Sequence, residues 1–185
     1  MEQKVADPGP LGLAAFAMTT FALSSANANL WKGAGITAAL SLAFFYGGIA
    51  QLLAGMWEFV RKNTFGALAF TSYGAFWLTF YAWVNWQKGA GGLGVLLLGW
   101  TIFTAYMTIV ATKTSNAVLL VFILLTFTFL FLTMGNWSAP NVHLHLVRVG
   151  GWLGLATAAA AWYASLAGAY NATAGKVVFP VGPRG

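Results

Sequence analysis

The chain has 185 residues, of which 59% are hydrophobic and 6% are charged, and its net charge is +6. Soluble domains carry about 25% charged residues. A chain as apolar as this one therefore needs lipid rather than water around it. Its nine Lys and Arg are scattered between apolar runs, which argues against nucleic-acid binding. Because the chain has no Cys, disulfides, thiolate metal sites and cysteine nucleophiles are excluded.

Six apolar runs are long enough to cross the roughly 30 Å hydrocarbon core of a bilayer as helices. In chain order they are residues 10–30, 36–60, 65–86, 92–112, 117–137 and 147–170. The runs are continuous and far longer than the roughly 10-residue alternating strands of a membrane barrel. The sequence therefore predicts an all-α membrane protein, in which residues 1–185 form one bundle of six transmembrane helices.

The distribution of cations predicts the orientation. With both termini inside, six Lys and Arg lie on the cytoplasmic side and three on the other, as the positive-inside rule prefers. Residues 1–9 and 171–185 are then cytoplasmic tails. The stretch from Lys4 to Ala28 also resembles a signal peptide with an Ala-x-Ala cleavage site, and its removal would leave five spans.

The second run carries small and polar residues on one helical face. Ala43, Gly47, Gln51 and Gly55 are four residues apart, and Glu58 returns to the same face. Small residues let helix backbones approach closely in lipid. Glu58 has two interpretations: a helix-end charge that pairs with Arg61 and Lys62, or a gate or proton site at the cytoplasmic end.

Other polar residues within the runs suggest a path between the helices. The first run has one stripe formed by Phe16, Thr20, Ser24 and Asn27, and the third and fifth runs contribute Ser72, Tyr73, Leu125 and Thr126. Each hydroxyl alone could bond only its own backbone. Together they predict a narrow path of hydroxyls and amides broken by aromatic and aliphatic collars, which would bind a carboxylate weakly enough to release it.

The two histidines lie in the loop predicted before the last run. His143-x-His145 could bind a metal, but two ligands without Cys or nearby acids make a weak site, so we expect no metal and no cofactor. A haem would need histidines at membrane depth on facing helices, and a Ser-His-Asp site would need an acid on the same side. We therefore do not expect an enzyme.

Several blocks resemble the acetate uptake transporter family. Asp7-Pro8-Gly9-Pro10-Leu11-Gly12-Leu13 is similar to the Asn-Pro-Ala-Pro-Leu-Gly-Leu signature of that family. Two longer blocks, residues 44–51 and 70–79, also match, and the resemblance extends from residue 7 to about residue 182.

The resemblance implies a homohexameric ring in a prokaryotic-type cell (inner) membrane, with one path per protomer. Acetate and other small carboxylates, including succinate for some members, would pass along it, through a channel or with protons in a carrier. By motif position, the family's hydrophobic constriction corresponds to Phe16, Tyr73 and Leu125, and Ala161 corresponds to a lining residue.

Two departures from the family signature lie at the entrance, where Asp7 replaces Asn and Gly9 replaces Ala. Asp7 can cap the first helix, with Pro8 at the first helical position and Pro10 following. The positive end of that helix then suits a carboxylate. A carboxylate side chain at the entrance would otherwise repel an anionic substrate, or alter the pH dependence of transport.

Other functions stay open on the sequence. A path of hydroxyls and aromatic rings would also serve a small neutral solute such as urea, ammonia or water. A membrane redox protein would use His143 and His145. A structural membrane scaffold would need neither a path for a solute nor a redox site.

Overall fold

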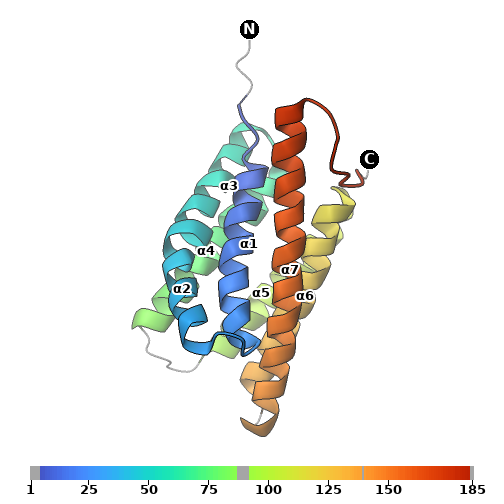
Figure 1. The fold of residues 1–185 in the computed structure, drawn as a ribbon. Coiled ribbons are helices and arrows are strands. Elements are labelled where there is room, and N and C mark those ends of the chain that lie inside the picture. Colours follow the sequence, from blue (N-terminus) through green and yellow to red (C-terminus); the bar gives the residue numbers. More distant parts are fainter. Residues whose placement is uncertain (1–4, 87–91, 139, 184–185) are drawn as a thin grey trace.

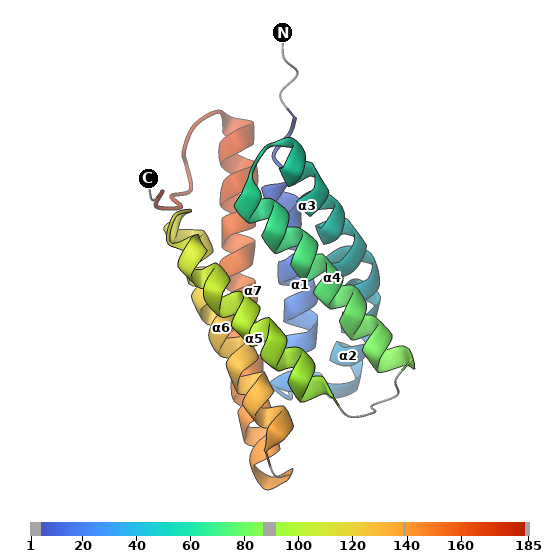
Figure 2. The same cartoon turned by 180° about the vertical axis from the view of Figure 1, so that it is seen from behind.

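Helices form nearly all of the computed structural model, which describes residues 5–86, 92–138 and 140–183. In chain order they are α1 (Gly9–Asn27), α2 (Lys32–Phe44), the π-helical turn η1 (Phe45–Ala50), α3 (Gln51–Val60), α4 (Thr64–Trp86), α5 (Leu93–Ala111), α6 (Asn116–Trp137) and α7 (Pro140–Ala174). Since α2, η1 and α3 follow one another without a break, these elements make six rods that pack side by side (Figures 1 and 2). An all-helical bundle is thus confirmed.

Five of the described helical segments are long and apolar enough to cross a membrane: Gly9–Asn27, Gly33–Val60, Leu93–Ala111, Asn116–Trp137 and Val142–Ala174. The sixth rod, α4, has 23 residues, which is enough to span, but it contains many Thr, Ser, Gly, Tyr and Trp residues that lower its hydropathy. These side chains suit its place in the bundle, because Tyr73, Phe76, Trp77 and Phe80 are all buried.

The last helix begins earlier than the sequence predicts. The run 147–170 lies within α7, which starts at Pro140 and has 35 residues, or about 52 Å of helix at about 1.5 Å per residue. Pro140 breaks the preceding helix and also suits the first turn of the next one. The prediction that His143 and His145 lie in a loop is therefore wrong, because both belong to α7. Figure 1 shows the α6–α7 hairpin projecting beyond the other helices.

Glycines bring α1 into close contact with its neighbours. A Cβ added at Gly151 of α7 would collide with the backbone nitrogen of Ala28, just after α1, and one added at Gly47 of η1 would collide with Thr19. In lipid no hydrophobic force drives helices together, so such close backbone approach supplies the packing energy. The predicted face of the second run is confirmed, since Ala43, Gly47, Gln51, Gly55 and Glu58 are all buried.

The chain after α7 folds back onto the start of α6. The backbone N–H groups of Asn116 and Ala117 donate to the carbonyls of Gly182 (2.8 Å) and Val181 (3.0 Å). Farther along α7, the Tyr163 hydroxyl donates to the carbonyl of Pro180 (2.7 Å). Residues 176–183, the strap, thus satisfy backbone donors that the first turn of α6 would otherwise leave unpaired.

Replacing Gly151 by Ala tests the glycine contacts. Because its new Cβ would meet backbone rather than a movable side chain, we expect Gly151→Ala to lower the free energy of unfolding by about 1–3 kcal/mol. The matched control is Gly99→Ala in α5, which meets nothing within 4 Å and should leave stability unchanged or slightly raised. Equal thermal unfolding temperatures for both variants in detergent would contradict this account.

Candidate functional site

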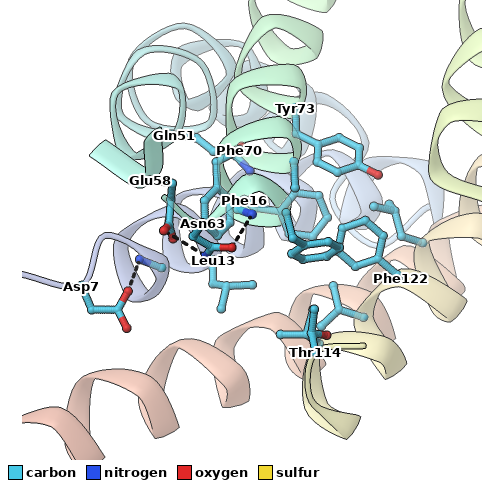
Figure 3. A pocket seen from close by; sticks show the side chains of 17 residues that line it. Asp7, Leu13, Phe16, Gln51, Glu58, Asn63, Phe70, Tyr73, Thr114 and Phe122 are labelled. Carbon is cyan, nitrogen blue, oxygen red and sulfur yellow. Dashed lines mark hydrogen bonds between the residues drawn. The ribbon is translucent and has the colours of Figure 1, made fainter. Parts of the chain in front are cut away.

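Two cavities enter the bundle from opposite ends of α1. The first, about 330 Å³, lies near the start of α1 (Figure 3). Side chains of four rods line it: α1, α2–α3, α4 and α6. The second, about 280 Å³, lies around the end of α1 and includes Asn27 and His143. Among the described residues, Phe16 and Leu125 alone line both cavities. These two side chains therefore lie at the boundary between the cavities.

Three buried side chains from three helices form this boundary, here called the neck: Phe16 of α1, Tyr73 of α4 and Leu125 of α6. They are 5%, 3% and 3% exposed, and the ring centroids of Phe16 and Tyr73 lie 5.8 Å apart. Tyr73 lines the first cavity only, where Phe122 lies 6.0 Å from it between ring centroids. Figure 3 shows the rings of Phe16, Tyr73 and Phe122 gathered on one side of the first cavity.

A hydrogen bond to α5 determines how Tyr73 enters the neck. Its hydroxyl lies 2.9 Å from Thr104 Oγ1, and the Thr104 hydroxyl donates to the carbonyl of Trp100 at 2.7 Å. Because the single Thr104 proton is used on that carbonyl, Tyr73 is the donor between the two. The polar end of Tyr73 is therefore satisfied by α5, and its ring contributes an apolar wall.

Charged residues gather at the mouth of the first cavity. Asp7 Oδ1 accepts the N–H of Gly9 at 2.9 Å and also pairs with Arg61 after α3. The prediction that Asp7 caps this helix with Pro8 at the first helical position is wrong, because α1 starts at Gly9 and its N-cap is Pro8, which has no side-chain cap. Asp7 accepts the Gly9 N–H from the position before the cap. Both partners of the ion pair are partly exposed, so it contributes little stability, but it ties the start of α1 to the α3–α4 turn.

Glu58 lies beneath this pair and is almost fully buried. Its Oε2 accepts a hydrogen bond from Asn63 Nδ2 at 2.9 Å, and a Cβ at Gly66 would collide with its carboxyl. The interpretation that Glu58 pairs with Arg61 is not supported: the ion pair found in the described part of the chain joins Arg61 to Asp7. Helical spacing suggested Glu58, the acid nearer in sequence, as the partner of Arg61, but the fold brings the more distant Asp7 to Arg61.

Residues with buried polar atoms that lack partners line both cavities. Gln51 belongs to the lining of the first cavity, and Thr20 and Trp77 belong to the lining of the second. Gln51 Oε1, Thr20 Oγ1 and Trp77 Nε1 have no hydrogen-bond partner among the described residues. Trp77 Nε1–H can only donate, so it suits an acceptor such as a carboxylate oxygen or water. Since leaving such groups unpaired is costly, these positions suit a polar molecule inside the path.

The predicted lining residues divide into two groups. Thr20, Ser24 and Asn27 line the second cavity, and Gln51 and Glu58 line the first. Five of the predicted residues line neither cavity: Pro8, Pro10, Ser72, Thr126 and Ala161.

The residues outside the cavities have other partners in the fold. The hydroxyl of Thr126 on α6 forms a 2.8 Å hydrogen bond with the hydroxyl of Thr108 on α5. Ala161 belongs to the buried core, and the carbonyl of Pro10 accepts a bond from Ser165 in α7. Thr126, Ala161 and Pro10 therefore take part in contacts between helices rather than in the lining of a cavity.

The sequence interpretation did not single out Trp77, Thr128 or Asn136 and did not place His143 in the path, although all four line the second cavity. The sequence did offer a signal for Trp77: its indole lies in the middle of an apolar run, whereas Trp residues of membrane helices prefer the interface. His143 and His145 are two residues apart in a helix, a spacing that does not place them on one face. No cluster of three or more potential metal ligands occurs in the described residues.

Comparisons with known proteins agree on one family. A family model for the GPR1/FUN34/yaaH family matches residues 1–183. The succinate-acetate/proton symporter SatP of Escherichia coli is 39% identical over 97% of this chain and 96% of its own length. The solved structure of the bacterial acetate channel SatP matches with a TM-score of 0.88 and 39% identity, covering 97% of this chain and 100% of that one.

Fungal relatives are also similar. Ammonia transport outward protein 2 of Saccharomyces cerevisiae is 40% identical over 89% of this chain and 62% of its own length. The chain spans less than two thirds of the length of five fungal relatives that it matches, between 58% and 66%.

The hydrogen bond that Asp7 accepts from Gly9 can be separated from the charge of Asp7. Asp7→Asn keeps an oxygen that accepts the Gly9 N–H, so we expect the free energy of unfolding to change by less than about 0.5 kcal/mol. Asp7→Ala removes the acceptor and should cost about 1 kcal/mol. Chemical unfolding in detergent measures both, and equal losses for the two variants would mean that the charge, rather than the bond from Gly9, stabilises this end.

Proposed function

Because this chain belongs to the GPR1/FUN34/yaaH family, we propose that it is a membrane channel or transporter for acetate and related small carboxylates, including succinate. The observation that carries this proposal is the pair of cavities that reach from opposite ends of α1 to one neck. The named relatives are transporters or channels, and we propose no catalytic role for the chain.

Neutral donors and an apolar neck together support selection of small carboxylates. At the first mouth the anion meets the positive end of α1 and a cation, Arg61, whose charge is offset by Asp7. Gln51 and then Trp77 offer polar contacts on the two sides of the neck. Such contacts are weak enough to release the ion, while the neck forces it to shed water, which only a small solute can do at modest cost.

The arrangement in the membrane is also part of this proposal. We propose that α4 is the sixth span, that residues 1–9 and 171–185 face the cytoplasm, and that the protein lies in a prokaryotic-type inner membrane as a single domain. The exposed apolar side chains along the outside of the bundle support contact with lipid and with neighbouring protomers. A homohexamer with one path per protomer is the assembly proposed.

A neutral solute is the second candidate, because one fungal relative is named for ammonia transport. The orphaned donor Trp77 Nε1–H favours an acceptor-rich carboxylate over a solute that is mainly a donor. Flux of labelled acetate, labelled urea and ammonia into liposomes containing the protein separates the candidates. Faster flux of ammonia or urea than of acetate would replace the first proposal with the second.

Widening the neck should relax size selection. We expect Phe16→Ala or Tyr73→Ala to raise the rate of succinate uptake relative to acetate by about tenfold, since a neck of large rings would become a wide opening, and about 1.4 kcal/mol of barrier corresponds to tenfold. The measurement is initial uptake of both labelled acids into liposomes. The matched control is Phe45→Ala, whose ring is 69% exposed on the outside of the bundle.

Unchanged acetate and succinate uptake in both neck variants would refute the assignment of Phe16 and Tyr73. Equal changes in the Phe45 control would point to general damage instead. Thermal unfolding of each variant shows whether the protein in the liposomes was folded.

Glu58 is the proposed gate and proton site at the first mouth, because it is a buried carboxyl that lines the cavity between Gly9 and Gly66. With an imposed pH gradient, we expect the unmodified protein to accumulate acetate above its equilibrium level. Glu58→Gln, which keeps the size of the side chain, should only equilibrate it. Uphill accumulation in both proteins would remove Glu58 from the coupling, and equilibration in both would indicate a channel.

A further inference from the structure

His143 occupies the mouth of the second cavity, at the end opposite Asp7. It lies near the start of α7 and is partly buried, and it lines the cavity together with Asn27, Asn136 and Val147. Its neighbour His145 is exposed and does not line either cavity. A side chain at this place meets any solute that enters or leaves by the second cavity.

A hydrogen bond fixes which nitrogen of His143 can change its charge. Nδ1 lies 2.8 Å from the backbone carbonyl of Gly135 at the end of α6. A carbonyl only accepts, so Nδ1 carries the proton of this bond. Nε2 is then the nitrogen that gains a proton when the ring becomes imidazolium. The bond to Gly135 survives that change, so the ring keeps its place.

No described acid near this mouth can neutralise an imidazolium. Among the twenty residues that line the second cavity, His143 is the only one with an acidic or basic side chain. In the elements that line the cavity with it, α1 and α6 carry no charged or titratable side chain, and α4 and α5 carry only tyrosines: Tyr73, Tyr81 and Tyr106. The remaining element, α2, contributes Ile36 and begins at Lys32, which is a cation and not an acid. On α7 itself the nearest such groups are His145 and Arg148, both exposed.

We propose that protonated His143 binds the carboxylate group of the substrate at the mouth of the second cavity, so that acid pH increases affinity for the anion on this face. The inference rests on the proposed carboxylate function and adds a residue to it. The positive end of α7 lies at the same mouth and acts in the same direction. Beyond His143, the unpaired Thr20 hydroxyl and Trp77 N–H continue the row of donors toward the neck.

The test measures half-saturation for exchange of labelled acetate into liposomes, with equal pH on both sides. His143→Asn is the informative variant, because Asn Nδ2 can replace Nδ1 in the bond to Gly135 while Nε2 is lost. At about pH 5.5 we expect its half-saturation concentration to exceed that of the unmodified protein by about three- to fivefold, and at about pH 8 to equal it. The size of the effect is that of a partly exposed ion pair.

Two further variants keep the inference falsifiable. His145→Asn should follow the unmodified protein at both pH values, and His143→Arg, with a permanent charge, should keep the lower half-saturation at about pH 8. The same ratio of His143→Asn to unmodified protein at both pH values would overturn the inference, while exchange itself would still support the carboxylate function. Absence of acetate exchange by the unmodified protein, above empty liposomes, would instead overturn the proposed function.

Discussion

The close approach of α1 to its neighbours is the constraint on which the rest of the bundle depends. Gly47 on one side and Gly151 on the other leave no room for a Cβ, so α1 lies against backbone on both. In a bilayer this close packing must replace the hydrophobic force that holds soluble helices together. Because α1 is held in this way, Phe16 lies opposite Tyr73 and Leu125, and the two cavities stop at the same side chains.

Charge is kept to the ends of the path, and neutral donors serve its length. Asp7, Arg61 and Glu58 belong to one mouth and His143 to the other, while hydroxyl, amide and indole groups lie between. A fixed charge near the neck would hold an ion too strongly or exclude it, because electrostatic energies are large where water is absent. Under the proposed function, neutral groups would let a partly dehydrated ion move from one contact to the next.

Hydropathy was enough to find the rods, and helical spacing was enough to find the buried face of α2–α3. Spacing could not decide between Leu125 and Thr126, which are about 100° apart on α6. Their roles depend on which neighbour each meets, and Thr126 meets a hydroxyl on α5. Arg61 shows the same limit, because its partner Asp7 is 54 residues away along the chain (61 − 7 = 54).

The start of α7 was hidden for a different reason. Proline both ends helices and begins them, so Pro140 could not be assigned to a loop or a helix from its identity. That ambiguity concealed the place of His143. The π-helical turn at Phe45–Ala50 has no simple sequence signal either, because it arises where Gly47 and Gly48 let the chain pass close to α1 and α4.

The strap joins the carboxyl end of the chain to the helix that supplies Leu125. Two carbonyls beyond α7 occupy the first amides of α6, and Tyr163 holds the same segment against α7. Pro183 therefore lies beside Ser115, at the first turn of α6. A force on residues 181–183 would therefore act directly on the first turn of α6, the helix that carries Leu125.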